Sequence, residues 1–324
     1  MGRLDELDAR LKARMDAMDK RLADRMAAVD ARLGNALGGT ASNNATSVAK
    51  SLGDAAQMTS GVGLSAAKGP NVKLALCVGL NNVDVQAYPG SSISPLSGCV
   101  VDVQRFKCVL EKLGFVVSML VDNEATCRAV YKSVLTAAAT LNPGDLFVLH
   151  ISGHGGRVKH GDKMRENWCL YDGFVWDDDI VWMFSRFKPG VRVLVINDQC
   201  HSGGIFQPKV FQTIADLAQL CARDGRTGDW NASVALNSPG FPMLIQFAGC
   251  RAEQISIDGL GGGTWTQALI NVLDEAAARN LPCTYRTWFD KAFCSPTLKR
   301  GSQDPQWVES PQVTDDFRER TALQ

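Results

Sequence analysis

Two short motifs in this sequence hold the residue types of a cysteine-dependent hydrolase. Residues 152–155 read Ser-Gly-His-Gly, and residues 198–204 read Asp-Gln-Cys-His-Ser-Gly-Gly. A cysteine thiolate is a strong nucleophile, and a nearby histidine can take its proton and later protonate a leaving group. The glycines in both motifs allow the backbone to turn sharply and to approach a ligand closely. The motifs therefore predict a catalytic pair of His154 and Cys200.

Each motif follows an apolar run that predicts a buried strand, at residues 145–150 and 191–197. The stretch between the runs is long enough for a helical crossover, so the two strands can be parallel neighbours. In open α/β sheets the reactive crevice lies beyond the carboxyl ends of the strands. His154 and Cys200 are therefore expected at the same edge of one sheet. The alternative for Cys200 is a structural cysteine before a turn, but the histidine motif favours the catalytic interpretation.

The other three histidines fit structural positions better. His201 directly follows the cysteine, and neighbouring side chains of an extended chain point in opposite directions. His150 lies inside a buried apolar run, which predicts a core histidine, and His160 falls in a predicted loop. His154 is therefore the expected catalytic base.

From residue 71 onward, strand-like apolar runs alternate with helical patterns, which is typical of a mostly parallel sheet covered on both faces. The predicted strands comprise residues 73–79, 115–121, 145–151, 191–197, 243–248 and, at one edge, 306–308. The predicted helices comprise residues 96–113, 126–139, 178–187, 264–279 and 285–294. A variable insertion without assigned strands or helices is expected at residues 157–171. A long connection that contains a short helix near residues 210–222 is expected at residues 205–240.

Composition limits the range of functions. The 324 residues include 34 Lys and Arg and 34 Asp and Glu, so the formal net charge is zero, and hydrophobic residues make up 45%. A neutral globular chain does not favour nucleic-acid partners, and no run of about eighteen apolar residues predicts a membrane span. The ten cysteines are scattered and form no C-x-x-C pair, which argues against zinc. This cysteine pattern favours a reducing, cytoplasmic location.

Residues 1–36 are expected to form one amphipathic helix, because an 11-residue repeat spaces the apolar residues at intervals of 3, 4 and 4. An 11-residue period favours a straight or slightly right-handed coiled coil. Residues 1–33 are nearly neutral, so self-association or pairing with a partner helix is favoured over a lipid surface or a lone solvated helix. Residues 37–70 are rich in small and polar residues and predict a flexible linker to a domain at 71–324.

Beyond these patterns, residues 72–308 resemble the caspase-like peptidases of the metacaspase branch, bacterial forms included. The matching segments follow the order and spacing of that family and comprise residues 74–79, 96–102, 152–155, 198–203, 247–250 with Gln254, and 263–269. The resemblance implies a caspase-like three-layer α/β sandwich with a mostly parallel six-stranded sheet. It also implies a cysteine-type endopeptidase, a thiol protease that acts on protein or peptide substrates.

By that resemblance, Cys200 attacks the scissile carbonyl, His154 is the general acid and base, and an acyl-enzyme forms before water releases it. The oxyanion of the tetrahedral intermediate would be held by the backbone N–H groups of Gly155 and Cys200. The alternative is a latent caspase fold that serves as a signalling scaffold, assembled through its N-terminal helix. Retention of both His154 and Cys200 argues against that alternative.

The resemblance further implies a substrate pocket for a basic side chain. Positions at which aspartate-cutting caspases carry Arg and Gln hold Leu96 and Asp198 here. Asp198 and Asp102 form the carboxylate pair of the metacaspase branch. Cys99 and Ser152 match further pocket-lining positions. Two carboxylates beside the nucleophile would bind a guanidinium or ammonium group, so cleavage after a basic P1 residue, Arg or Lys, is expected. Asp102 also fits a second interpretation, an acid that stabilises a helix start.

Calcium dependence has only partial support in the sequence. Asp177 and Asp178 match an acidic pair used for calcium in some metacaspases, with Asp172 nearby, and clustered oxygen ligands suit this cation. However, a further acidic position of the family is Gln207 here. An acidic helix N-terminus explains the pair equally well. The sequence therefore predicts no metal or other cofactor.

Overall fold

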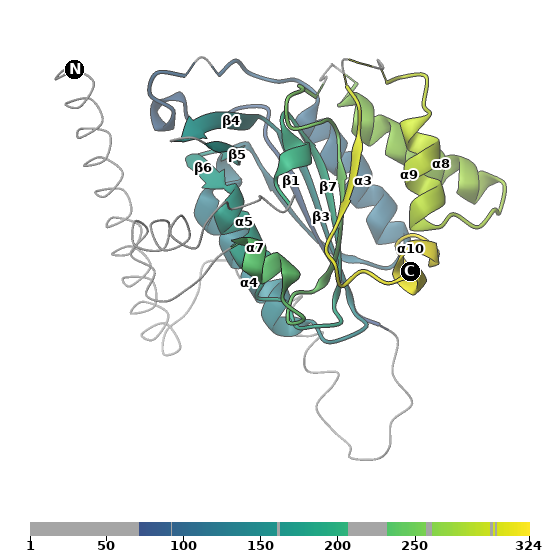
Figure 1. Ribbon diagram of the computed structural model, residues 1–324. Coiled ribbons are helices and arrows are strands. Elements are labelled where there is room, and N and C mark those ends of the chain that lie inside the picture. Colours follow the sequence, from purple (N-terminus) through teal and green to yellow (C-terminus); the bar gives the residue numbers. More distant parts are fainter. Residues whose placement is uncertain are drawn as a thin grey trace, which may run out of the picture. The chain divides into compact units, whose positions relative to one another are not determined.

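The computed structural model describes residues 71–324 apart from 92, 161–162, 207–231, 257–260, 299–300 and 302. The predicted N-terminal helix, the predicted linker and the short helix expected near 210–222 lie outside the described residues. Within the described part, strands and helices alternate along the chain as the sequence predicts (Figure 1).

A six-stranded sheet forms the centre of the fold, and its first five strands are parallel. The sixth strand pairs antiparallel at one edge. In spatial order the strands are β2 (Val116–Val121), β1 (Lys73–Gly79), β3 (Leu146–Gly153), β7 (Arg192–Gln199), β8 (Met243–Ala248) and β9 (Gln306–Glu309). All residues of the two central strands, β3 and β7, are buried, as expected for parallel strands covered on both faces.

Helices cover both faces of this sheet, which gives three layers (Figure 1). On one face lie α3 (Cys99–Lys112), α8 (Thr264–Ala278) and α9 (Tyr285–Phe293). The other face carries α4 (Cys127–Thr140), α5 (Asp177–Phe184) and the short α7 (Ala232–Asn237). A last short helix, α10 (Asp315–Glu319), lies near the C-terminus. The expected caspase-like three-layer sandwich is therefore confirmed.

Local sequence explains where two of these helices begin. The Thr126 hydroxyl accepts a hydrogen bond from the backbone N–H of Ala129 and caps α4. The Thr284 hydroxyl accepts one from Thr287 and caps α9 in the same way. Such caps satisfy backbone donors that a helix start leaves unpaired.

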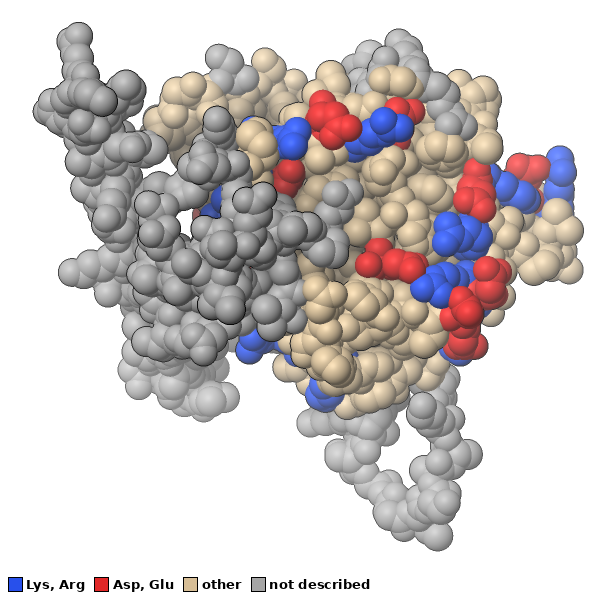
Figure 2. All heavy atoms as spheres, viewed as in Figure 1, with Lys and Arg blue, Asp and Glu red and all other residues tan. Residues whose placement is uncertain are grey.

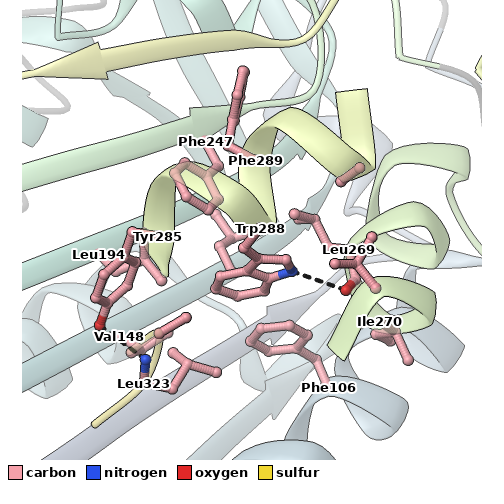
Figure 3. Packing of buried hydrophobic residues seen from close by; sticks show 14 of the residues in the cluster. Phe106, Val148, Leu194, Phe247, Leu269, Ile270, Tyr285, Trp288, Phe289 and Leu323 are labelled. Atoms are coloured by element: carbon pink, nitrogen blue, oxygen red, sulfur yellow. Dashed lines mark hydrogen bonds between the residues drawn. The ribbon is translucent and has the colours of Figure 1, made fainter. Parts of the chain in front are cut away.

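Aromatic side chains fill the space between the sheet and the helices α3, α8 and α9 (Figure 3). The rings of Phe106 and Trp288 stack with centroids 6.3 Å apart, and Phe247 meets Trp288 edge-on at 5.4 Å. The indole N–H of Trp288 donates a 2.9 Å hydrogen bond to the carbonyl oxygen of Leu269, so its polar atom is satisfied within the core. Burial of each such ring contributes about 1.5–3 kcal/mol before entropy costs.

A second, three-stranded antiparallel sheet was not predicted. It consists of β4 (Gly155–His160), β5 (Lys163–Leu170) and β6 (Gly173–Trp176) and replaces most of the expected insertion at 157–171. His160 ends β4, so its predicted place in a loop is wrong. The sequence did not indicate this sheet because charged residues are frequent in residues 157–166. Its buried side chains include Trp168 of β5.

Charges of both signs lie beside one another on the face shown in Figure 2. Among the described residues, Arg318 pairs with Glu309 and Arg320 pairs with Asp316. In the part of the chain that the structure describes, no helix is both long and apolar enough to cross a bilayer. The nine cysteines in that part are all free thiols.

Candidate active site

His154 and Cys200 lie level with each other at the carboxyl ends of two neighbouring strands. In the parallel pairing of β3 with β7, the last residues, Gly153 and Gln199, are opposite each other. His154 and Cys200 directly follow them in the chain. The side-chain amide of Gln199 donates a 2.7 Å hydrogen bond to the backbone oxygen of His154, which ties the two strand ends together. The structure thus brings together the two residues that the motifs singled out.

A backbone carbonyl orients the ring of His154. The Nε2 atom lies 2.7 Å from the carbonyl oxygen of Ser94, in the loop between β1 and α3. A carbonyl oxygen can only accept, so Nε2 carries the ring proton and Nδ1 is the basic nitrogen. The half-buried ring is therefore held with Nδ1 ready to take a proton. Sequence reasoning missed Ser94, because a backbone carbonyl leaves no signal in residue types.

The thiol of Cys200 is half-buried, and its Sγ lies 3.9 Å from the carbonyl oxygen of Ser256. Burial raises the pKa of the Cys200 thiol above its ordinary value. The negative charge of Asp198 also raises this pKa, while backbone hydrogen bonds at Ser256 and at Cys200 itself lower it. The thiol is thus the stable form at neutral pH, and a thiolate forms only with a base at hand.

Gly155 and Cys200 approach each other so closely that a side chain on Gly155 would not fit. A Cβ built there would overlap the carbonyl oxygen of Cys200 and lie 3.1 Å from the Cβ of Gln199. The backbone of Gly155, which begins β4, therefore runs directly against the cysteine. From such a position its N–H group, together with that of Cys200, can hold an oxyanion.

Asp102 lies fully buried in the first turn of α3. The Ser152 hydroxyl donates a 2.9 Å hydrogen bond to its Oδ2, and the backbone N–H of Gly263 lies 3.0 and 2.9 Å from its two oxygens. These donors are neutral, so they orient the carboxylate without cancelling its charge. Asp102 thus occupies a helix start and also contacts the residue before α8. Cys99, buried one turn earlier, lies on the same side of α3.

Asp198, two residues before Cys200, is buried and held by the start of α8. Its Oδ2 accepts hydrogen bonds of 2.9 Å from both the backbone N–H and the hydroxyl of Thr266. Its Oδ1 accepts a short hydrogen bond from the Ser256 hydroxyl. These donors are also neutral. Sequence reasoning gave neither Ser256 nor Thr266 a role, because their types are common in caps and loops.

The two carboxylates meet at Gly263, the residue that caps α8. A Cβ built on Gly263 would overlap Oδ2 of Asp198 and lie 3.1 Å from Oδ2 of Asp102. Two negative charges therefore flank one glycine at the positive end of a helix, and one of them, Asp198, is two residues before Cys200. This arrangement is suited to a cation of the size of a guanidinium or ammonium group.

His201, the rival base, is directed elsewhere. Its backbone is left-handed, with φ of 60°, and its Nδ1 lies 2.7 Å from the carbonyl oxygen of Ala252. Its backbone N–H also donates to the carbonyl oxygen of Gln254. The residue after the cysteine thus anchors the loop that follows β8.

Comparison with known proteins places this arrangement in a family. Residues 72–317, most of the chain, match the family described as the caspase domain. The chain belongs to this family. The caspase domain thus comprises the whole six-stranded sheet and the two motifs that hold His154 and Cys200.

The relatives of this caspase domain include several metacaspases. Metacaspase-8 of Arabidopsis thaliana is 32% identical over 152 residues, which cover 42% of this chain and 38% of the relative. Metacaspase-4 of the same plant is 34% identical over 149 residues, 41% of this chain and 34% of the relative. Metacaspase-5 of Trypanosoma brucei brucei is 31% identical over 217 residues, 59% of this chain and 41% of the relative. The resemblance to the metacaspase branch is confirmed.

The chain spans only about a third to two fifths of the length of these three curated relatives. Among solved structures, the crystal structure of protein GSU0716 from Geobacter sulfurreducens is similar to this fold, with a TM-score of 0.61 and 26% identity. That match covers 78% of this chain and 98% of the other. The caspase fold therefore extends through most of the described residues.

The acidic residues that matched a calcium site in some metacaspases already have cationic or backbone partners in this caspase domain. Arg165 lies 3.1 Å from Oδ1 of Asp177 and 2.9 Å from Oδ2 of Asp178. Oδ1 of Asp172 accepts a 2.7 Å hydrogen bond from the backbone N–H of Cys127. A guanidinium thus occupies the place beside the pair, and the described residues contain no cluster of three or more metal-ligating side chains. These residues do not fit a calcium ion.

Proposed function

We propose that this caspase domain is a cysteine endopeptidase that cleaves after Arg or Lys, with Cys200 as nucleophile and His154 as general acid and base. The observation that carries the proposal is the meeting of Asp102 and Asp198 at Gly263, with Asp198 two residues before the thiol. A basic side chain bound between these carboxylates would place its own carbonyl group near Cys200. A positively charged side chain would interact favourably with two buried carboxylates, whereas a negatively charged one would be repelled.

In the proposed reaction, Nδ1 of His154 takes the thiol proton and the sulfur of Cys200 attacks the scissile carbonyl carbon. The carbonyl π bond opens, and the oxyanion is held by the N–H groups of Gly155 and Cys200. When this intermediate collapses, the C–N bond breaks and His154 gives its proton to the leaving amine. Water then attacks the thioester carbonyl carbon while His154 takes a proton from it. The C–S bond breaks, His154 returns the proton to the sulfur, and the carboxylic acid product leaves.

Hydrolysis of fluorogenic peptides ending in Arg, Lys or Asp tests the proposal. The wild type should cleave the Arg and Lys peptides, and Cys200→Ala and His154→Ala should each abolish cleavage while circular dichroism stays unchanged. Turnover that survives in Cys200→Ala would contradict the role of the thiol. A wild type that cleaves none of the peptides would favour the alternative, a caspase-fold scaffold without activity.

The pocket is tested by Asp198→Ala. Loss of one partner of a buried charged contact costs about 2–5 kcal/mol, so kcat/KM for the Arg peptide should decrease by tens-fold or more. The circular dichroism spectrum should match that of the wild type. Efficient cleavage of the Asp peptide by the wild type would show that the two carboxylates do not form the specificity pocket.

A further inference from the structure

A buried hydrogen-bonded chain runs from His150 to the carboxylate of Asp198. His150 lies in β3, is fully buried, and packs its ring 4.7 Å from the ring of Phe106 in α3. Its Nε2 lies 3.1 Å from the hydroxyl oxygen of Thr266. That hydroxyl in turn lies 2.9 Å from Oδ2 of Asp198. The proposed mechanism uses neither His150 nor Thr266.

The direction of each hydrogen bond in this chain is fixed by chemistry. A carboxylate can only accept, so the hydroxyl of Thr266 donates to Asp198 and has only lone pairs left for His150. Nε2 of His150 must therefore donate, which makes Nδ1 the unprotonated nitrogen. Nδ1 has no hydrogen-bond partner among the described residues. Burial lowers the pKa of His150 to about 3, so the ring is neutral at neutral pH.

The other oxygen of Asp198 is supported in the same manner. Ser256 donates its hydroxyl proton to Oδ1, and the side-chain amide of Gln303 donates a 2.8 Å hydrogen bond to that hydroxyl. Gln303 is itself fully buried and accepts a 2.6 Å hydrogen bond from Thr264. Each oxygen of the Asp198 carboxylate thus accepts a hydrogen bond from one hydroxyl group, and a second buried side chain orients each of these hydroxyls.

We propose that His150 is a positioning residue that, through Thr266, fixes the carboxylate of Asp198 for a positively charged P1 side chain. The inference rests on the proposed function. It assigns to His150 and Thr266 the orientation of the carboxylate that would select a basic side chain. Because His150 and Thr266 are both neutral, this chain holds the carboxylate in one orientation without placing a positive charge beside it. A cationic support would hold Asp198 equally well but would compete with the substrate.

The test compares an Arg-ended peptide with its citrulline counterpart, which has nearly the same shape and no charge. Thr266→Val removes the hydroxyl at nearly constant volume and should lower the Arg-to-citrulline ratio of kcat/KM by about tenfold, mainly through KM, the scale of one hydrogen bond to a charged group. His150→Phe should lower the ratio about threefold. Thr266→Ser and His150→Gln, which restore the donors, should bring it to within twofold of the wild type.

The matched control is Cys77→Ala, because Cys77 pairs with His150 across β1 and β3 and is equally buried. It should lower the melting temperature without changing the Arg-to-citrulline ratio. If Thr266→Val and His150→Phe stay active and keep the wild-type ratio, the positioning role is wrong while the proposed function stands.

A binding measurement separates the two proposals when hydrolysis fails. Calorimetry on full-length Cys200→Ala compares acetyl-arginine amide with acetyl-citrulline amide. If the wild type is inactive but the arginine ligand binds better, and Thr266→Val removes that preference, the positioning role holds and the peptidase proposal fails. If neither ligand binds and no peptide is cleaved, both proposals fail.

Discussion

At the scale of the residue, Cys200 must be buried enough to react in a confined pocket and must still ionise. Burial and the charge of Asp198 both raise the pKa of its thiol. The rate of alkylation by iodoacetamide should therefore be low at neutral pH and increase as the pH rises through and above the ordinary cysteine range. Asp198→Asn removes one of the causes, so its rate curve should shift to lower pH.

The measurement follows alkylation of the full-length protein from about pH 6 to about pH 10 by mass spectrometry of the Cys200 peptide. Asp102→Asn is the control, since it removes an equivalent carboxylate on the other side of Gly263. It should shift the curve less than Asp198→Asn does. Equal shifts in the two variants, or none in Asp198→Asn, would contradict a direct effect of Asp198 on the thiol.

Gly155 offers a second test at this scale. Gly155→Ala would force the backbone away from the carbonyl oxygen of Cys200, so the proposed oxyanion donor would be displaced. Loss of one such donor costs about 10²–10³-fold in kcat, and that decrease is expected here. Gly153→Ala is the matched control, because a Cβ there would come no closer than 3.5 Å to its neighbours. Near wild-type kcat in Gly155→Ala would exclude the oxyanion role.

The sequence indicated the candidate catalytic residues more clearly than the residues that contact and orient them. His154 and Cys200 stand in glycine-flanked motifs after apolar runs, which is a signal that one sequence can carry. Asp102 and Asp198 came from the resemblance to a family. Ser94 acts through a backbone carbonyl, and the Thr266 hydroxyl reaches Asp198 only because α8 begins beside the end of β7. Such contacts depend on tertiary structure, so residue types alone do not predict them.

At the scale of the element, apolar runs predicted the six strands of the main sheet, and helical periodicity predicted the long helices. The strand signal is clearest in β1, β3, β7 and β8, because nearly all of their residues are buried. The sheet of β4, β5 and β6 was not predicted, because its sequence contains no long apolar run. Residues 157–166 are mostly charged or polar, and part of the hairpin faces solvent, with Val158 45% exposed. An antiparallel hairpin of this kind depends on its packing against the rest of the domain.

The N-terminus of α5 holds the acidic pair that matches a calcium site in some metacaspases. Arg165 of β5 contacts both Asp177 and Asp178, so a guanidinium supplies the positive charge that a calcium ion would bring. The hydrolysis rate of the Arg peptide by the wild type should therefore stay within about twofold when EGTA removes calcium. Arg165→Ala leaves two partly buried carboxylates without this partner and should destabilise the domain by about 3 kcal/mol.

Thermal unfolding with and without millimolar calcium completes the measurement. Calcium should raise the melting temperature of Arg165→Ala more than that of the wild type, because only the variant has an uncompensated acidic pair. Arg186→Ala is the control, an arginine whose guanidinium lies 5.0 Å from the ring of Trp182 in α5. If the wild type loses most of its activity in EGTA, the hypothesis that the Arg165 guanidinium takes the place of a calcium ion is wrong.

At the scale of the whole molecule, the caspase domain leaves residues 1–70 without a role in the proposed chemistry. The repeat in residues 1–36 lies outside the described residues, so its helix and its partner stay predictions. A helix of about 30 residues with one narrow apolar stripe cannot bury that stripe against itself. The stripe comprises nine large side chains, namely Leu4, Leu7, Leu11, Met15, Met18, Leu22, Met26, Val29 and Leu33. Burial on a second helix would contribute on the order of 1–2 kcal/mol for each before ordering costs.

We therefore expect the full-length protein to self-associate through this helix. Replacing Met15, Met18 and Leu22 with Gln should dissociate the assembly in light scattering and leave hydrolysis of small peptides largely unchanged, because the catalytic motifs are far from the repeat in the chain. A control variant carries Gln at three alanines that follow stripe positions by two residues and thus lie on the opposite side of a helix, namely Ala13, Ala17 and Ala28. It should stay associated. If the wild type is a monomer even at high micromolar concentration, the stripe must pair with a different protein, and residues 1–33 would then serve as bait to capture that partner helix.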